Sequence, residues 1–430
     1  MNKTIVIKRH ISLLVAIASL CISTVYAQNF TKEVLLPDNS SIIRTVKKNQ
    51  WLTYSIGEKG KAFYLVPVTG TALPYLSLDD KEIEVLDFKV FSDTVFFCGK
   101  MTRENTSDAI VGHFPIAGFP DVIVKYDTFP EVRYFDQMDV FKDGNKARIV
   151  ATAYWGYFKG TMADIIHLSG DNWECRIVDP SGFSWWFGDV TVTSEHVVFT
   201  SNSVKSYMNK WLTRIWIFKK PVAPAGSIFL SSVDLREFVD SLSSGKMLVT
   251  KTIGDWFVTA NPTPEGKLLM HEFGGTGYYG STLYNGVPNF TLKDLVHIPL
   301  PNCTDVLTYS WNASATGSYI YHIPESAFDE DGPANIHYYE NENINSLCLS
   351  SMPDSLFVAS GHNDFSQSLR IFRYKYDNYS CAERLTYGTS KRYYEPEKPK
   401  IGIKVINYPH EFIQHDSIPE ETNISTLCGQ

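Results

Sequence analysis

One strand–turn–strand pattern constrains what this chain can fold into more than any other feature of its sequence. Residues 85–100, VLDFKVFSDTVFFCGK, begin with bulky β-forming residues such as Val85 and Phe88. The turn residues Ser92 and Asp93 follow, and a second short apolar run comes after them. Two β-forming runs on either side of a short polar turn are typical of an antiparallel hairpin. The pattern therefore predicts two paired strands over this stretch.

Variants of this hairpin recur along the chain, with about seven copies spaced roughly 40 to 65 residues apart. The other copies lie at 43–56, 137–154, 187–202, 254–273, 304–323 and 345–362. A third apolar segment follows most copies, at 61–68, 109–116, 164–168, 212–218 and 368–374. Each period therefore contains three or four short strands.

Repeated groups of three or four short strands are the signature of a β-propeller. A four-stranded blade cannot bury both of its faces alone, so neighbouring blades must stack around a central axis. A pair of β-sandwiches or a β-helix is the alternative, and neither accounts as well for long, irregular periods. We therefore predict an all-β fold, a β-propeller with about seven blades of short antiparallel strands. Segment 33–36 should close the ring by pairing with the run at 371–374 or with 403–408.

The first 27 residues have the pattern of a signal peptide. Lys3, Lys8 and Arg9 are followed by a short apolar stretch, 11–22, and by Val25-Tyr26-Ala27 at the expected cleavage positions. The apolar stretch is shorter than the roughly 20 residues that a membrane span requires. We therefore predict a signal peptide at 1–27, one propeller domain at 28–392 and a tail at 393–430 that wraps the propeller. The protein should be exported to the periplasm, the cell surface or the medium, without a membrane span.

Net charge limits the class of partner. The formal net charge is −8, and it becomes −11 when the three positive residues of the signal peptide are removed. Nucleic acids and anionic membrane surfaces attract basic patches, so an acidic exported chain is a poor candidate for binding either. The sequence leaves a glycan or another protein as the expected partner.

Two further expectations concern local structure. Residues 231–245 have serines at the start, apolar residues at helical spacing and a final glycine, which predicts a short amphipathic helix inserted between blades. Residues 328–345 predict an exposed loop beside a strand at 336–339. In the hairpins, turn residues should be exposed and the phenylalanines that follow them buried. The turn residues are Asp93, Ser194 and Asp354, and the phenylalanines are Phe97, Phe199 and Phe357.

Linear catalytic motifs are missing from the chain: it has no GxSxG, no phosphate-binding loop, no HExxH and no dinucleotide fingerprint. The sequence therefore identifies no catalytic residue, and it predicts no cofactor and no metal. The metal alternative involves His271, His322 and His362, which end their hairpins at similar positions, but no carboxylate pattern accompanies them. The aspartates before the apolar runs should accept hydrogen bonds from nearby backbone amides. These aspartates are Asp87, Asp189, Asp255 and Asp305.

Aromatic residues at strand ends are the best candidates for a binding site. The candidate ligand-binding residues are Trp155, Trp185, Trp186, Tyr278 and Tyr279. Flat, rigid rings stack on sugar faces and peptide side chains at a low entropic cost. If all five lie in connections on one face of the propeller, they should converge there. The alternative interpretation is that they pack between blades.

At the level of pattern, the chain resembles uncharacterised exported β-propeller proteins of Bacteroidota. The resemblance is carried by the Gln28-Asn29 start after the signal peptide, the abundance of Tyr, Asn and Ser, and units such as VLDFKVFSDTVFFCG. It implies no catalytic residues, and fold alone does not fix function. The leading hypothesis is a propeller that binds glycan or protein through one face. The alternative is an exported polysaccharide hydrolase or lyase whose acids come from inter-blade loops.

Overall fold

The hairpin at 85–100 forms the two inner strands of a blade. In the computed structural model, β6 (Ile83–Phe91) and β7 (Thr94–Arg103) pair antiparallel on either side of the Ser92-Asp93 turn. Asp93 and Ser194 are exposed at their turns, while Phe97 and Phe199 are fully buried, as the sequence predicts. The corresponding Asp354 and Phe357 side chains lie outside the described residues.

The structure describes the 29 strands named below and, of their connections, residues 78, 81–82, 92–93, 116–124, 130–133, 144–145, 172, 193–195, 220, 247 and 254–255. The described side chains lie mainly within 62–296. The predicted signal peptide at 1–27 is outside the described residues, as is most of the predicted tail. The described residues contain no helix with the length and hydrophobicity that crossing a membrane requires.

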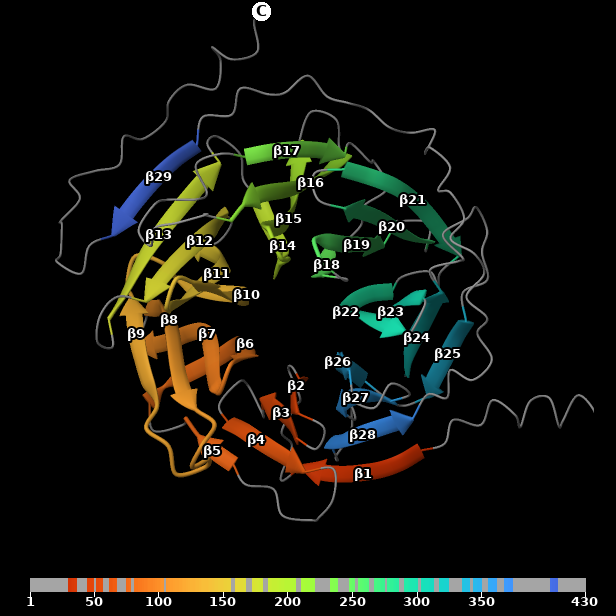
Figure 1. Ribbon diagram of the computed structural model, residues 1–430, viewed down its shortest axis with the longest axis horizontal. Coiled ribbons are helices and arrows are strands. Elements are labelled where there is room, and N and C mark those ends of the chain that lie inside the picture. The colour runs from red at the N-terminus through yellow and green to blue at the C-terminus, as the bar shows by residue number, and fades with distance from the viewer. Residues whose placement is uncertain are drawn as a thin grey trace, which may run out of the picture.

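The strands form seven antiparallel blades arranged in a ring (Figure 1). Blade 1 has β2 (Thr45–Asn49), β3 (Leu52–Ile56), β4 (Ala62–Pro67) and β5 (Tyr75–Ser77). Blade 2 adds β8 (Thr106–Pro115) and β9 (Lys125–Phe129) to β6 and β7. Blade 3 has β10 (Tyr134–Asp143), β11 (Lys146–Trp155), β12 (Lys159–His167) and β13 (Trp173–Pro180). Blade 4 has β14 (Trp185–Val192), β15 (His196–Lys205), β16 (Lys210–Lys219) and β17 (Val233–Phe238).

The remaining three blades complete the ring. Blade 5 has β18 (Leu248–Lys251), β19 (Trp256–Pro262), β20 (Lys267–Gly274) and β21 (Gly277–Asn285). Blade 6 has β22 (Phe290–Leu300), β23 (Cys303–Asn312), β24 (Gly317–Pro324) and β25 (Asn335–Glu340). Blade 7 has β26 (Asn343–Leu349), β27 (Ser355–Gly361) and β28 (Gln367–Arg373), and its outer strand is β1 (Phe30–Leu36). The predicted strand at 336–339 is confirmed as part of β25.

Strand β1 closes the ring, because it pairs antiparallel with β28 and so joins the two ends of the propeller in one sheet. This confirms the strand that contains the first predicted partner, but the register places 33–36 opposite 367–370, while Ile371 and Phe372 lie opposite Lys32 and Phe30. The other candidate, β29 (Ile403–Tyr408), pairs with β13 and adds a fifth strand to the outside of blade 3. Blades 3 and 4 also share a sheet through one pairing, Gly160 with Trp185.

Two sequence interpretations are wrong. Residues 233–238 form strand β17, which pairs with β16 along the outside of blade 4, instead of the predicted helix. The unpaired edge of β16 offers this segment a ladder of backbone hydrogen bonds, which outweighs a weak helical pattern. In blades 5 and 6, the units at 254–273 and 304–323 are the second and third strands, not the first and second.

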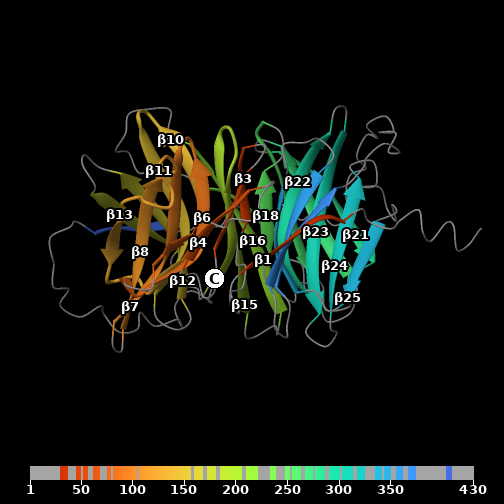
Figure 2. The same ribbon diagram turned by 90° about the horizontal axis from the view of Figure 1, so that it is seen from below.

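The ring has two faces, which are the two ends of the blades in Figure 2. We call the end where each innermost strand begins the entry face. We call the opposite end, where the innermost strand turns into the second strand, the hairpin face. Because strands within a blade are antiparallel, second strands end on the entry face and fourth strands begin on the hairpin face.

A repeated aspartate joins neighbouring blades at their inner strands. The Oδ1 atoms of Asp87, Asp139, Asp189 and Asp294 each accept the next residue's amide at 2.8 Å. Their Oδ2 atoms reach the next blade, accepting from Met138 N (2.8 Å), Val192 N (2.8 Å), Val249 N (3.1 Å) and Ser346 Oγ (3.0 Å). The predicted structural role is therefore confirmed for Asp87 and Asp189. Charge-assisted bonds of this kind fix the rotation of one blade against the next.

Apolar clusters fill the spaces between the described blades. The cluster between blades 3 and 4 contains Phe141, Val150 and Met162 from one side and Phe187, Phe199 and Trp216 from the other. The cluster between blades 4 and 5 contains Val198, Ile215 and Ile217 from blade 4, together with Met247, Val249, Phe257 and Phe273. Blade 4 therefore buries both of its faces against its neighbours, which a single blade could not do alone.

Candidate functional site

A pair of tyrosines marks the entry face where blade 3 meets blade 4. Tyr134 is the first residue of β10 and Tyr154 lies opposite it near the end of β11. Their rings stack with centroids 4.6 Å apart and planes 14° apart, and both side chains are half-buried. We call Tyr134, Tyr154, Trp155, Trp185 and Trp186 the aromatic corner. Offset-stacked rings hold each other in place, so the pair presents a rigid aromatic edge.

Tyr154 also ties the corner to blade 4. Its hydroxyl donates a hydrogen bond to the carbonyl of Phe187 at 2.9 Å. Burial raises the pKa of Tyr154, and the nearby Asp136 carboxylate and Tyr134 raise it further. The pKa of Tyr134 is raised as well, first by burial and then by Asp136. Both phenols therefore keep their protons at neutral pH, and the Tyr154 hydroxyl acts as a hydrogen-bond donor.

Trp155 has a packing role as well as a place in the corner. It is the last residue of β11 and is half-buried. Its ring packs against the apolar cluster between blades 2 and 3, on the side of the sheet opposite Tyr154. The inter-blade packing considered in the sequence analysis thus holds for Trp155.

Trp185 and Trp186 open β14, the innermost strand of blade 4, on the entry face. Trp185 is paired with Gly160 of blade 3 and Ser203 of β15, and Trp186 with Asn202. The backbone therefore brings both tryptophan positions beside the end of blade 3 that carries Tyr154 and Trp155. The backbone thus places three of the five predicted positions at one corner of one face, although the Trp155 ring packs towards blade 2.

Tyr278 and Tyr279 do not join them. They are the second and third residues of β21, which is the outermost strand of blade 5 and begins on the hairpin face. The prediction that all five residues share a face is wrong. The error follows from the strand count in blade 5. Strands in a blade are antiparallel, so a strand number that is wrong by one moves the next connection to the opposite end of the blade.

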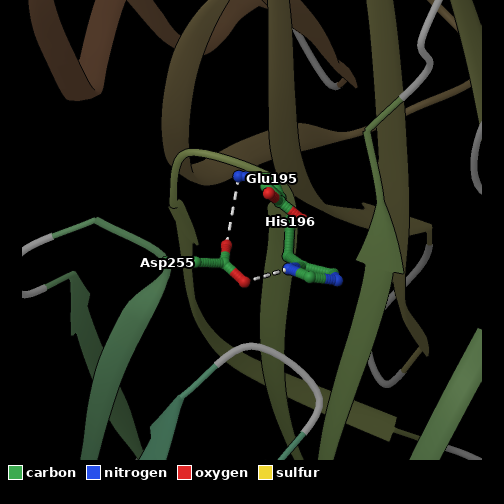
Figure 3. Close-up of side chains that lie close together, drawn as sticks. All are labelled: Glu195, His196 and Asp255. Carbon is green, nitrogen blue, oxygen red and sulfur yellow. Dashed lines mark hydrogen bonds and ion pairs between the residues drawn. The ribbon is translucent and has the colours of Figure 1, made fainter.

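A second cluster of polar residues, which the sequence analysis did not identify as a site, joins blades 4 and 5 on the hairpin face (Figure 3). Asp255 lies in the β18–β19 turn, and its Oδ2 lies 2.6 Å from Nδ1 of His196 at the start of β15. Its Oδ1 accepts hydrogen bonds from the Glu195 amide (3.1 Å) and from the Thr193 hydroxyl. The Ser194 amide donates to the Gly254 carbonyl at 3.2 Å, which adds a backbone bond between the same two turns.

The electrostatics of this cluster suit a structural link between blades 4 and 5. We call this link, formed by Thr193, Glu195, His196 and Asp255, the clasp. Partial burial acts to raise the pKa of Asp255, but hydrogen bonds from Thr193, His196 and the Glu195 amide outweigh it, so the pKa lies below its ordinary value. One ligand atom each from Glu195, His196 and Asp255 lies within 4.8 Å of the others, which is close enough for a shared metal ion. However, both Asp255 oxygens already accept bonds from protein donors. The Lys220 ammonium also lies nearby and donates to the Ser194 carbonyl at 3.0 Å. The donor set therefore fits a clasp better than a metal site.

Sequence reasoning could have found part of this arrangement. Asp255 was singled out as a turn aspartate, and it does accept a backbone amide, but its main partners lie on the neighbouring blade. His196 carried no signal, because a lone histidine at a strand start has many possible roles. Of the three histidines considered for a metal, His271 is buried in blade 5, and the side chains of His322 and His362 lie outside the described residues.

Comparison of the sequence with protein-family models and with curated proteins finds no match. Several solved structures resemble the chain. YCF48 bound to D1 peptide has 12% identity, with a TM-score of 0.48 over 83% of this chain and 98% of that chain. Drosophila Semaphorin 1b extracellular domains 1–2 have 10% identity and a TM-score of 0.46 over 80% and 87%. Trypanosoma rangeli sialidase in complex with the inhibitor DANA has 9% and 0.40 over 80% and 60%. These scores are low, and the propeller assignment rests on the strand pairing of this chain.

Proposed function

We propose that this protein is an exported binding module that holds a glycan or a protein segment at the aromatic corner of its entry face. The signal-peptide pattern at 1–27 supports export, and the acidic net charge favours neutral or basic ligands over nucleic acid. The propeller acts as a rigid frame, because aspartate links and apolar clusters fix blades 2 to 5 against one another.

One observation carries the proposal. The stacked pair of Tyr134 and Tyr154 lies half-buried on the entry face, next to the point where Trp185 and Trp186 begin the innermost strand of blade 4. Rigid aromatic rings with protonated hydroxyl groups offer both flat apolar faces and hydrogen-bond donors. Sugars and peptide side chains are recognised through this combination.

The hairpin face and the entry face differ in how far their polar groups are already bonded within the protein. On the hairpin face, the polar groups of His196 and Asp255 are bonded to each other and hold two turns together. On the entry face, the tyrosine rings are only half-buried and one phenol is bonded to a backbone carbonyl. A surface whose groups are already paired within the protein has less to offer a ligand than one whose rings are partly open.

Binding of the full-length exported protein to glycan arrays and to peptide arrays tests the proposal. We expect hits on one array, and we expect Trp186→Ala to weaken the binding by about 1–3 kcal/mol with the melting temperature nearly unchanged. Tyr279→Ala, on the hairpin face, is the matched control and should leave binding intact. A large fall in melting temperature without loss of binding would show that Trp186 serves to pack the blades.

The alternative function is cleavage of polysaccharide by a hydrolase or a lyase, and a hydrolase requires two carboxyl groups about 5–10 Å apart beside the bound sugar. Asp136 lies near the tyrosine pair, because its negative charge raises the pKa of both Tyr134 and Tyr154. We therefore test it as one of the two carboxyl groups. Incubation of the protein with each glycan that it binds, followed by analysis of chain length, separates the two functions. Shortened products that disappear in Asp136→Asn would replace the binding module with an enzyme.

A further inference from the structure

Blade 5 carries a group of polar side chains where an apolar interface would be expected. Thr259 and Asn261 lie two residues apart on β19, and Thr259 lies opposite His271 on β20. Successive side chains of a strand alternate between its two faces, so all three residues share one face of the blade. They are 0%, 1% and 5% exposed, respectively.

This face is turned towards blade 4. Phe257, two residues before Thr259, and its cross-strand partner Phe273 belong to the cluster that also contains Val198, Ile215 and Ile217 of blade 4. The register of β19 with β20 runs without a shift from Phe257 to Pro262. The interface between blades 4 and 5 is thus apolar at the level of the phenylalanines and becomes polar towards the entry face.

The polar groups of Thr259 and Asn261 are not satisfied within the described protein. The Thr259 hydroxyl oxygen and both polar atoms of the Asn261 amide are buried without a hydrogen-bond partner. A buried amide or hydroxyl left without partners costs roughly 1–3 kcal/mol each, and native proteins seldom tolerate several together. A partner other than the protein itself would remove this cost.

We propose that ordered water binds between blades 4 and 5, bridging the Thr259 hydroxyl and the Asn261 amide. Residues two apart on a strand are about 6.7 Å apart along the backbone, and a water molecule with two hydrogen bonds of about 2.8 Å spans most of that distance. Three polar atoms supply the two to four partners that a buried water typically has. The carboxamide offers both donors and acceptors, so it can bind water in more than one orientation.

The surroundings favour a neutral occupant. Burial lowers the pKa of His271 to about 4, so its imidazole is uncharged at neutral pH. The cluster members around Phe257 and Phe273 are apolar. An ion at this position would lose its hydration without gaining a counter-charge from these residues, whereas water keeps hydrogen bonds with Thr259 and Asn261.

A high-resolution crystal structure of the full-length protein tests the site directly. We expect density for at least one water molecule within hydrogen-bonding distance of both Thr259 Oγ1 and the Asn261 amide. A dry gap would overturn the inference. Rotation of the two side chains onto protein partners, or a larger bound molecule in the same place, would overturn it as well.

The Thr259→Val variant provides a second test whose sign is decisive, because valine has nearly the same shape as threonine. If water binds the hydroxyl, the substitution removes a hydrogen bond, and we expect the melting temperature to fall by about 1–2 °C. If the hydroxyl is dry and unpaired, the variant removes a buried polar group and the melting temperature should rise. Thr152→Val is the matched control. Thr152 is also fully buried, and its hydroxyl accepts the Gln137 amide at 3.0 Å, so this variant should lower the melting temperature in either case.

Discussion

The two sides of blade 4 solve the problem of buried polar groups in different ways. Towards blade 3, the fully buried Arg148 donates to Asp164 through Nε (2.7 Å) and Nη2 (2.5 Å), and to Asp143 through Nη1 (2.7 Å). This charged triad lies on the face of blade 3 that also carries Phe141 and Val150. Towards blade 5, Thr259, Asn261 and His271 form a neutral buried group, and the polar atoms of Thr259 and Asn261 have no protein partner among the described residues.

The difference reflects what each kind of group costs to bury. A buried charge is so expensive that its partner must be built into the same fold, and bidentate arginine–carboxylate geometry is the best way to provide one. Burial by itself acts to lower the pKa of Arg148, and the hydrogen bonds and charges of Asp164 and Asp143 more than restore it. A neutral amide or hydroxyl costs less, so solvent can serve as its partner.

The largest expected effect tests the charged triad of Arg148, Asp143 and Asp164 between blades 3 and 4. Arg148→Met leaves Asp143 and Asp164 buried close together without a cation, and we expect a loss of about 3–5 kcal/mol in the free energy of unfolding by chemical denaturation. Lys100→Met is the control, because its pair with Glu84 is about one-third exposed on both sides and should contribute less than about 1 kcal/mol. A loss of similar size in the two variants would contradict the account of the triad.

The next effect concerns His271, which lies with Thr259 and Asn261 among the neutral buried groups between blades 4 and 5. Its folded pKa of about 4 lies below the ordinary value of 6.5. Above pH 6.5 both the folded and unfolded states hold a neutral imidazole. As the pH falls towards 4 the unfolded state binds a proton that the folded state does not, so stability is lost, by up to about 3 kcal/mol. Subtracting the pH profile of His271→Gln isolates this contribution, and identical profiles for the two proteins would show that the imidazole is not buried as described.

A smaller effect is expected at Gly188, where the backbones of blades 4 and 5 lie close together. A Cβ atom at Gly188 would lie 2.3 Å from the Met247 carbonyl oxygen and 2.9 Å from the Thr200 hydroxyl oxygen. Gly188→Ala therefore forces the innermost strands apart, and we expect a loss of about 1–3 kcal/mol in denaturant unfolding. An unchanged stability would mean that this interface yields more easily than the backbone contact implies.

The smallest effect concerns strand β29, which comes from outside the seven copies of the repeat, and strand β1 provides the contrast. Strand β29 pairs with β13 alone, whereas β1 closes the ring by pairing with β28. Deletion of residues 393–430 should therefore cost about 1 kcal/mol or less, since terminal segments open at little cost. Deletion of 30–36 should abolish cooperative unfolding. Equal losses for both deletions would show that ring closure does not depend on β1.

The repeated hairpin was enough to predict the architecture from sequence. Strand bulk, turn residues and the spacing of the copies are local properties, and they indicated seven blades. Which two strands of a blade a hairpin forms is not a local property. A hairpin of first and second strands resembles a hairpin of second and third strands in composition. That is why Tyr278 and Tyr279 were assigned to the wrong face. The β17 segment was predicted as a helix because its local pattern is weakly helical, whereas the β16 edge that it pairs with is a tertiary feature. The clasp between His196 and Asp255 joins residues 59 positions apart, and no linear pattern signals it.

The central claim is that ligand binds at the aromatic corner of the entry face and not on the hairpin face. Hydrogen–deuterium exchange with and without the ligand identified on the arrays tests it most directly, because no substitution is needed. We predict that ligand slows amide exchange at 133–136, 153–155 and 185–187, and leaves 193–196 and 277–279 unchanged. Protection confined to 193–196 and 277–279 would place the ligand on the hairpin face and contradict the claim.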